Sequence, residues 1–195
     1  MDHLEVIERA LKDNIESSII ARKIFLAYPT AIFIDDEDLE FEILNKIKGY
    51  FDIDFSSIRI VGSSKTKRSL HKDNVFTPKV SDLDVAIINP ALFLKYVEIS
   101  YGATDGYSDL TGFRRLSGGR PAYTDFFKYI TKGIFRPDLM PRCERSTDWR
   151  TFFNRLSVDY SGYFKSINAG IYASEYIFEQ KQARLIDSYK ISKGI

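Results

Sequence analysis

Two aspartates, Asp82 and Asp84, stand two residues apart in the stretch Ser-Asp-Leu-Asp-Val-Ala-Ile-Ile at residues 81–88. The apolar and β-branched residues around them predict a strand over residues 82–88, and side chains two apart on a strand share a face. The carboxylates would therefore lie side by side and repel each other unless a cation lay between them. Carboxylate oxygens suit Mg²⁺ or Mn²⁺ bound together with triphosphate oxygens. The pair predicts a divalent-metal site for phosphoryl transfer.

A glycine-serine turn, Gly62-Ser63, follows a second short apolar stretch at residues 58–61, which also predicts a strand. Gly62 would let a phosphate approach the backbone closely, and Ser63 offers a hydroxyl and an amide. Ser64 and Lys65 extend this candidate nucleotide-binding segment. The basic residues at 65–68 are interpreted equally well as an ordinary solvated charge run.

Taken together, a glycine-serine pair after one strand and a Ser-Asp-x-Asp strand resemble the signature of the DNA polymerase β-like nucleotidyltransferases. The resemblance covers residues 58–88. That superfamily includes minimal nucleotidyltransferase antitoxins, enzymes that synthesise oligonucleotides or cyclic dinucleotides, and adenylyltransferases. The resemblance implies that Gly62 and Ser63 contact the nucleotide phosphates. It also implies that Asp82 and Asp84 are catalytic residues that hold Mg²⁺ or Mn²⁺, which would orient the α-phosphate.

The sequence departs from the family pattern in two places. The gap between Gly62 and Asp82 is wider than in compact members, so residues 68–80 are expected to form an inserted loop. Family enzymes usually carry a third carboxylate on a later neighbouring strand, and the strand predicted at residues 163–173 has Asn168 there. Asparagine can ligate a metal but cannot act as a general base. Asp159 is the nearest alternative acid, and Asn168 could instead satisfy backbone groups in a buried strand.

The elements around these residues follow from apolar spacing and capping residues. Apolar residues at helical spacing between Leu4 and Ile19 predict a first helix that ends before Pro29. Asn89-Pro90 is typical of a helix start, and Ser174 could cap a helix through about residue 189. Further helices are expected from about 36 to 51, over 123–132, and after a cap at Ser146 or Thr147, with a long loop at 100–121.

This order of elements predicts an α+β fold, with a small mixed or antiparallel sheet flanked by helices, of the polymerase β nucleotidyltransferase type. A length of 195 residues suits one domain with a substantial core. We expect a single domain over 1–195, with an N-terminal helical part at 1–50 and a core at about 56–190.

Composition limits the partners and the compartment. The chain carries 28 Lys and Arg against 27 Asp and Glu, so any phosphate-binding surface must be local. The single cysteine, Cys143, allows no disulfide within the chain and no thiolate metal cluster, which fits a reducing compartment. The sequence has no apolar run of membrane-spanning length and no signal-peptide pattern at its start. We therefore expect a cytoplasmic protein with no membrane partner.

Two functions follow as hypotheses. The first is a metal-dependent nucleotidyltransferase that moves a nucleoside monophosphate from a nucleoside triphosphate such as ATP to an acceptor hydroxyl on protein, RNA or another nucleotide. The second is a catalytically weak or inactive module of the same fold that binds a protein partner in a bacterial antiviral defence or toxin–antitoxin system. The missing third acid supports the second. The simplest alternative is that the aspartates are solvated charges on an edge strand.

Overall fold

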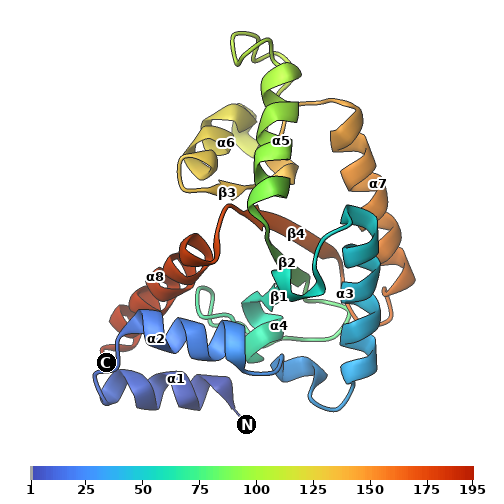
Figure 1. Ribbon diagram of the computed structural model, residues 1–195. Coiled ribbons are helices and arrows are strands. Elements are labelled where there is room, and N and C mark those ends of the chain that lie inside the picture. The colour runs from blue at the N-terminus through green and yellow to red at the C-terminus, as the bar shows by residue number, and fades with distance from the viewer. Residues whose placement is uncertain (1) are drawn as a thin grey trace.

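The computed structural model describes residues 2–195 and has a four-stranded mixed sheet at its centre (Figure 1). The strands are β1 (Ile58–Val61), β2 (Leu83–Ile88), β3 (Ile134–Phe135) and β4 (Ile167–Tyr172), in the order β1-β2-β4-β3. β2 pairs antiparallel with β1 and parallel with β4, and β3 pairs antiparallel with β4. Together with the helices, this sheet makes the protein an α+β fold, which confirms the expected class.

Eight α-helices surround the sheet within the described residues: α1 (His3–Lys12), α2 (Ser17–Ala21), α3 (Glu37–Phe51), α4 (Gly62–Thr66), α5 (Pro90–Gly102), α6 (Ala122–Ile130), α7 (Glu144–Asp159) and α8 (Glu175–Lys193). A π-helical segment, η1 (Arg22–Ala27), extends α2. Single 3-10 turns lie at η2 (Ala31–Phe33), η3 (Phe55–Ser57), η4 (Ser117–Gly119) and η5 (Pro137–Leu139).

Between residues 2 and 195, no single helix is both long and apolar enough to cross a bilayer. Two helical stretches, Ser17–Phe33 and Glu37–Phe51, reach that length and apolarity only as a pair, and a bend of 115° separates them.

The sheet separates two apolar cores because its side chains alternate between its faces. Ile60, Val85 and Ile87 point into the core built with α3, α5, α6 and α7. Ala86 and Tyr172 point to the other face, where α1, α2, η1 and α8 pack. Asp84 lies two residues before Ala86 and therefore belongs to this second face. Asp84 reaches solvent on this face, although neighbouring groups such as the Gly62 turn crowd its carboxylate.

The N-terminal segment differs from the single helix that its apolar spacing predicted. Asn14 adopts a left-handed conformation with φ of 56°, and the chain turns there between α1 and α2. Asparagine tolerates this conformation better than most residues, which explains why the turn falls at this position. The turn lets Ile7 of α1 and Ile20 of α2 share one core with α8 (Figure 1).

Capping residues set several of the other boundaries. Asn89 caps α5 as predicted, since its side chain accepts a hydrogen bond from the Leu92 amide at 2.8 Å. Ser174 caps α8 as predicted, accepting from the Ile177 amide at 3.2 Å. The cap predicted for α7 at Ser146 or Thr147 is wrong. That helix starts earlier, with Cys143 as the cap and Ser146 inside the first turn, where its Oγ accepts from the Cys143 amide at 3.0 Å.

Two of the strands differ from what the sequence predicted. β4 is shorter than the predicted strand at 163–173, because the chain at Tyr160–Phe164 is still turning out of α7. β3 was not predicted, since two apolar residues, Ile134 and Phe135, carry no periodicity.

The expected inserted loop lies between α4 and β2, where an isolated bridge joins Arg68 to Val75.

Candidate metal and phosphate site

Strand pairing brings the predicted site residues together. Asp84 of β2 is paired with Val61 of β1 on one side and with Asn168 of β4 on the other. Its neighbours Leu83 and Val85 are buried in the opposite core, and this burial fixes the direction in which Asp84 points. Asp82 directly precedes β2. Its negative charge raises the pKa of Asp84, after the larger effect of burial, so the two carboxylates lie within electrostatic range of each other.

Gly62 forms the turn against which the Asp84 carboxylate lies. Its φ is +70°, a conformation that glycine adopts without steric cost. A Cβ atom at this position would lie 2.8 Å from Asp84 Oδ2. The glycine is therefore required twice, once for its backbone conformation and once for the space that the carboxylate fills. The proposed phosphate-contacting turn and the proposed metal ligand are immediate neighbours.

A chain of hydrogen bonds orients the Asp82 carboxylate. Ser166, just before β4, donates its hydroxyl to Asp82 Oδ1 at 2.7 Å. Asn168 Nδ2 in turn donates to Ser166 Oγ at 2.8 Å. Since a serine hydroxyl has a single hydrogen, the amide of Asn168 directs that hydrogen toward Asp82. Asn168 thus has an observed role in positioning Asp82, and its own Oδ1 faces no hydrogen-bond donor within residues 2–195.

The local electrostatics disfavour a bare carboxylate pair. Partial burial beside the sheet raises the pKa of Asp84 above its usual range, and the like charge of Asp82 raises it further. The nearby cations Arg136 and Lys72 lower it, but do not cancel the rise. No side chain or amide in the described residues donates a hydrogen bond to Asp84. An added cation would relieve this unfavourable arrangement.

Sequence reasoning missed the cations on the far side of the site. Arg136 follows β3 directly, pairs with Asp138 at 2.8 Å, and lies over the Tyr129 ring with 5.1 Å between the guanidinium carbon and the ring centroid. Desolvation by surrounding groups lowers the pKa of Lys181 on α8, and the charges of Lys132 and Arg136 lower it further. Because β3 has only two residues, the sequence offered no signal that would place Arg136 beside Asp84.

Two residues of the predicted phosphate-binding segment point elsewhere. Ser64 is fully buried, and its Oγ donates to the backbone oxygen of Asp82 at 3.2 Å, which ties α4 to β2. Lys65 is 4% exposed, and its Nζ donates to the Tyr28 carbonyl at 2.6 Å, on the side of α4 that faces the N-terminal segment. Their predicted contact with phosphate does not fit these positions. Ser63 is half-buried and makes no hydrogen bond through its hydroxyl in the described structure, so it remains the candidate.

The buried Lys65 predicts a specific pH dependence of stability. Burial lowers the pKa of its ammonium to about 8, from an ordinary value of 10.5. The folded state therefore holds this proton less tightly than the unfolded state, and the cost of burying the charge is present in full below pH 8. Between pH 8 and 10.5 the free energy of unfolding should rise, relative to Lys65→Met, by at most about 3 kcal/mol. Urea denaturation across this range measures it, and parallel pH curves would contradict it.

Asp159, the alternative third acid, lies away from this group. It ends α7, and its Oδ2 is 3.5 Å from Nζ of Lys46 on α3. Both side chains are largely exposed, so the pair is an ordinary surface ion pair of small energetic value. Of the two candidates for the third position, only Asn168 stands beside Asp84.

The residues brought together fit a hard divalent cation. Asp82 and Asp84 provide two carboxylates, and Asn168 adds an amide oxygen in the adjacent strand. No cluster of three or more His, Cys, Asp or Glu side chains able to hold a metal occurs between residues 2 and 195. Mg²⁺ is commonly held by one or two carboxylates with substrate phosphates and water completing its coordination. The donor set therefore suits a metal that arrives with a phosphate ligand.

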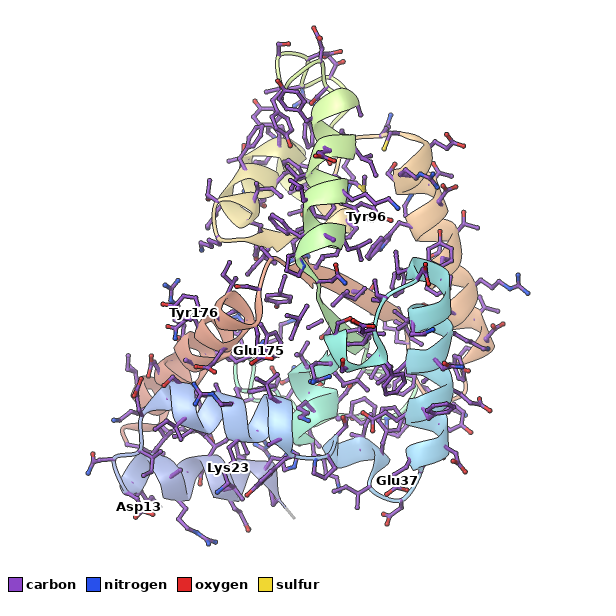
Figure 2. The ribbon with its side chains drawn as sticks, viewed as in Figure 1. Asp13, Lys23, Glu37, Tyr96, Glu175 and Tyr176 are labelled. Atoms are coloured by element: carbon purple, nitrogen blue, oxygen red, sulfur yellow. The ribbon has the colours of Figure 1, made fainter. Side chains whose placement is uncertain are left out.

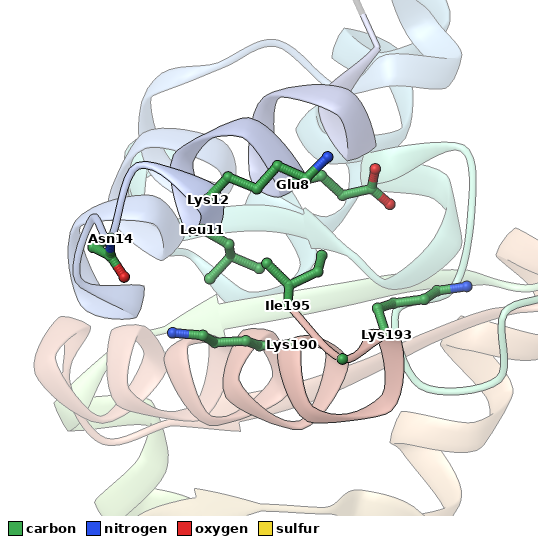
Figure 3. A pocket seen from close by; sticks show the side chains of 8 residues that line it. Glu8, Leu11, Lys12, Asn14, Lys190, Lys193 and Ile195 are labelled. Carbon is green, nitrogen blue, oxygen red and sulfur yellow. The ribbon is translucent and has the colours of Figure 1, made fainter.

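A separate hollow of about 810 Å³ lies between α1 and the C-terminal end of α8 (Figure 3). Glu8, Lys12 and Lys190 line it, and Glu8 already accepts a hydrogen bond from the Tyr189 hydroxyl at 2.6 Å. It contains none of the predicted site residues. The carboxylate group beside Gly62 therefore remains the candidate site.

Comparisons with known proteins identified no relative of this chain. No protein-family model, curated protein or solved structure matches the chain. The protein is α+β in class with a four-stranded mixed sheet, and a fold class does not by itself imply a function.

Proposed function

We propose that this protein is a metal-dependent nucleotidyltransferase with a polymerase β-type fold. It would transfer a nucleoside monophosphate from a nucleoside triphosphate to an acceptor hydroxyl and release pyrophosphate. The observation that carries this proposal is the contact between Asp84 and the Gly62 turn, with Asp82 near enough for its charge to act on Asp84. A metal held by the two carboxylates would lie next to a backbone turn open to phosphate.

Each residue of the candidate site would have its own role in the proposed transfer. Asp82 and Asp84 would hold Mg²⁺ or Mn²⁺, which when bound would supply positive charge for the transferring phosphoryl group. Gly62 keeps the backbone accessible, and the Ser63 hydroxyl donates to a phosphate oxygen. Arg136 and the exposed Lys72, whose charges reach Asp84, add positive charge for the remaining phosphates.

Asn168 supports a second candidate function, a nucleotide-binding module with little or no turnover. It stands where a third carboxylate would complete the site, directly beside Asp84. Because an amide cannot accept a proton as a carboxylate does, the attacking hydroxyl would have no base in this position. Such a module would act through a protein partner, as in an antiviral defence or toxin–antitoxin system.

One pair of measurements separates the two functions. Calorimetry with ATP and with GTP, in Mg²⁺ and then in excess chelator, tests metal-dependent binding. Incubation with nucleotides labelled at the α-phosphate, together with protein, RNA and nucleotide acceptors, tests transfer. Binding with transfer supports the enzyme, binding without transfer supports the module, and binding that persists unchanged in chelator would exclude both.

Replacing Asn168 with aspartate should strengthen metal binding. Asn168→Asp places a third carboxylate in the strand position adjacent to Asp84, and we expect Mn²⁺ affinity to rise about tenfold, since a unit charge at close range contributes a few kcal/mol before desolvation. Calorimetric Mn²⁺ titration measures this, and transfer activity should rise if a base was missing. Asn154→Asp, on the exposed surface of α7, is the matched control. Equal gains in both variants would remove Asn168 from the site.

A further inference from the structure

A cavity of about 180 Å³ lies on the opposite face of the sheet from Asp84, between α3, α5 and α7. Tyr50, Phe51 and Tyr96 form its aromatic walls. Ligand pockets for drug-sized molecules occupy roughly 300–1,000 Å³, so this volume suits a single ring system. The nucleotidyltransferase proposal makes no use of this cavity.

The aromatic walls are held in fixed orientations. Tyr50 stacks on Phe152 with ring centroids 3.9 Å apart and planes 13° from parallel. Tyr96 packs edge-on against Trp149, with centroids 5.2 Å apart. Phe51 lies 4.8 Å from both Tyr50 and Trp149. Rings packed in this way are already ordered, so a ligand that contacts them causes little further loss of side-chain entropy.

One polar group in the cavity, the hydroxyl of Tyr96, has no hydrogen-bond partner within the described residues. Tyr96 is 5% exposed and lies on the side of α5 that faces α7 (Figure 2). Its hydroxyl makes no hydrogen bond in the part of the chain that the structure describes. The hydroxyl oxygen is not fully enclosed by protein, so it is open to a hydrogen-bond partner that enters the cavity.

Charged side chains stand at the mouth of the cavity. Lys95 and Arg145 are exposed there, and Arg145 Nη1 lies 3.2 Å from Asp148 Oδ2. The three charges sum to one positive charge, so an anionic group would be favoured outside the aromatic walls. Asp148 can accept a hydrogen bond from an N–H at the edge of a ring, and the Tyr96 hydroxyl can donate to a ring nitrogen or oxygen.

We propose that this cavity is a second ligand site that takes a nucleoside monophosphate, with its base between the aromatic walls and its phosphate at Lys95 and Arg145. Base stacking on aromatic side chains contributes about 1–3 kcal/mol per base, and arginine and lysine supply the phosphate contact. The site uses neither a metal nor the carboxylates on the other face. It is therefore suited to an effector, whose binding is separate from the proposed transfer.

Trp149 offers an intrinsic probe, because it is the only tryptophan in the chain and contacts both Tyr96 and Phe51. Titration with AMP in excess chelator should produce a saturable change in its emission. The change should persist in the double variant Asp82→Asn/Asp84→Asn, whose carboxylates lie on the other face. AMP binding measured in this way would remain even if the protein were not a nucleotidyltransferase. Absence of AMP binding would likewise leave the nucleotidyltransferase proposal untouched.

Two cavity variants and one control test whether AMP binds in this cavity. Ile99→Phe, which fills the cavity, should weaken AMP binding at least tenfold, and Tyr96→Phe should weaken it about fivefold, the value of one neutral hydrogen bond. Tyr101→Phe, an exposed residue of the same helix that does not line the cavity, should bind as the parent does. Thermal melting checks that each variant folds. Binding unchanged in Tyr96→Phe and Ile99→Phe would overturn the site.

The two halves of the ligand are tested separately. Adenosine should bind more weakly than AMP, and inorganic phosphate alone should leave Trp149 emission unchanged. An equal response to adenosine would overturn the phosphate contact, and an equal response to phosphate would overturn the placement of the base. No response to AMP at millimolar concentration would overturn the proposal as a whole.

Discussion

The double variant Asp82→Asn/Asp84→Asn should lose metal-dependent nucleotide binding, with affinity for ATP in Mg²⁺ falling on the order of a hundredfold. Amides keep the shape of the side chains but remove both negative charges, and the metal then has no anionic protein ligand. Calorimetry in Mg²⁺ and in chelator measures the loss. Asp159→Asn is the matched control, because that carboxylate is exposed and pairs only with Lys46. Comparable losses in the control would move the site away from β2.

In the single variant Asp84→Asn, stability should change in the opposite direction to nucleotide binding. Partial burial and the charge of Asp82 raise the pKa of Asp84, so the folded state holds that proton more tightly than the unfolded state. The charged form is therefore penalised at neutral pH, and the penalty is relieved as pH falls through the raised value toward 3.8. Asp84→Asn should raise the melting temperature at pH 7 and flatten its acid dependence. A lower melting temperature would contradict the repulsion between the two carboxylates.

Gly62→Val should abolish the site through backbone geometry. Its Cβ would meet Asp84 Oδ2 at 2.8 Å, and valine at a φ of +70° is strained as well. We expect the free energy of unfolding to fall by about 1–3 kcal/mol from the strain and metal-dependent nucleotide affinity to fall at least tenfold, since Asp84 must move. Urea denaturation and calorimetry measure the two effects.

Gly118→Val separates the effect of backbone strain from the effect of displacing the Asp84 carboxylate. Gly118 also has a positive φ, of +79°, but no atom lies within 4 Å of a Cβ built there. This variant should lose stability from the backbone conformation and keep nucleotide binding. If Gly62→Val binds nucleotide as well as Gly118→Val does, the Gly62 turn has only a structural role.

Ser63→Ala should have a smaller effect than these glycine variants. The structure shows why Ser63 is the side chain of this segment to replace. Of the four residues at 62–65, only Gly62 and Ser63 remain available to a ligand, because Ser64 and Lys65 are buried against Asp82 and Tyr28. The short helix α4 buries the consecutive residues Ser64, Lys65 and Thr66, and a sequence pattern alone did not show which of them would face the core. The local motif therefore identified the turn, but packing selected its accessible residues.

The sequence by itself determined the two strands that carry the site. Residues 58–61 and 83–88 are short, apolar and β-branched, and the two-residue spacing of Asp82 and Asp84 predicted that their carboxylates share one face. Gly62 after β1, the cap at Asn89 and the cap at Ser174 were also readable, because each depends on the chemistry of a few adjacent residues. These features are local, so one strand or one turn suffices to specify them.

Only the tertiary structure decided which distant residues meet the carboxylates. The parallel pairing of β2 with β4 places Asn168 beside Asp84, and Ser166 beside Asp82, across more than eighty residues of chain. Arg136 reaches the same face through β3, a strand of two residues held by its pairing with β4 and not by its own propensity. Long-range pairing depends on the shape and burial of the whole sheet, whereas periodicity records only neighbours along the chain. For this reason the sequence indicated a metal-binding pair, while the fold supplied its hydrogen bonds and its surrounding charges.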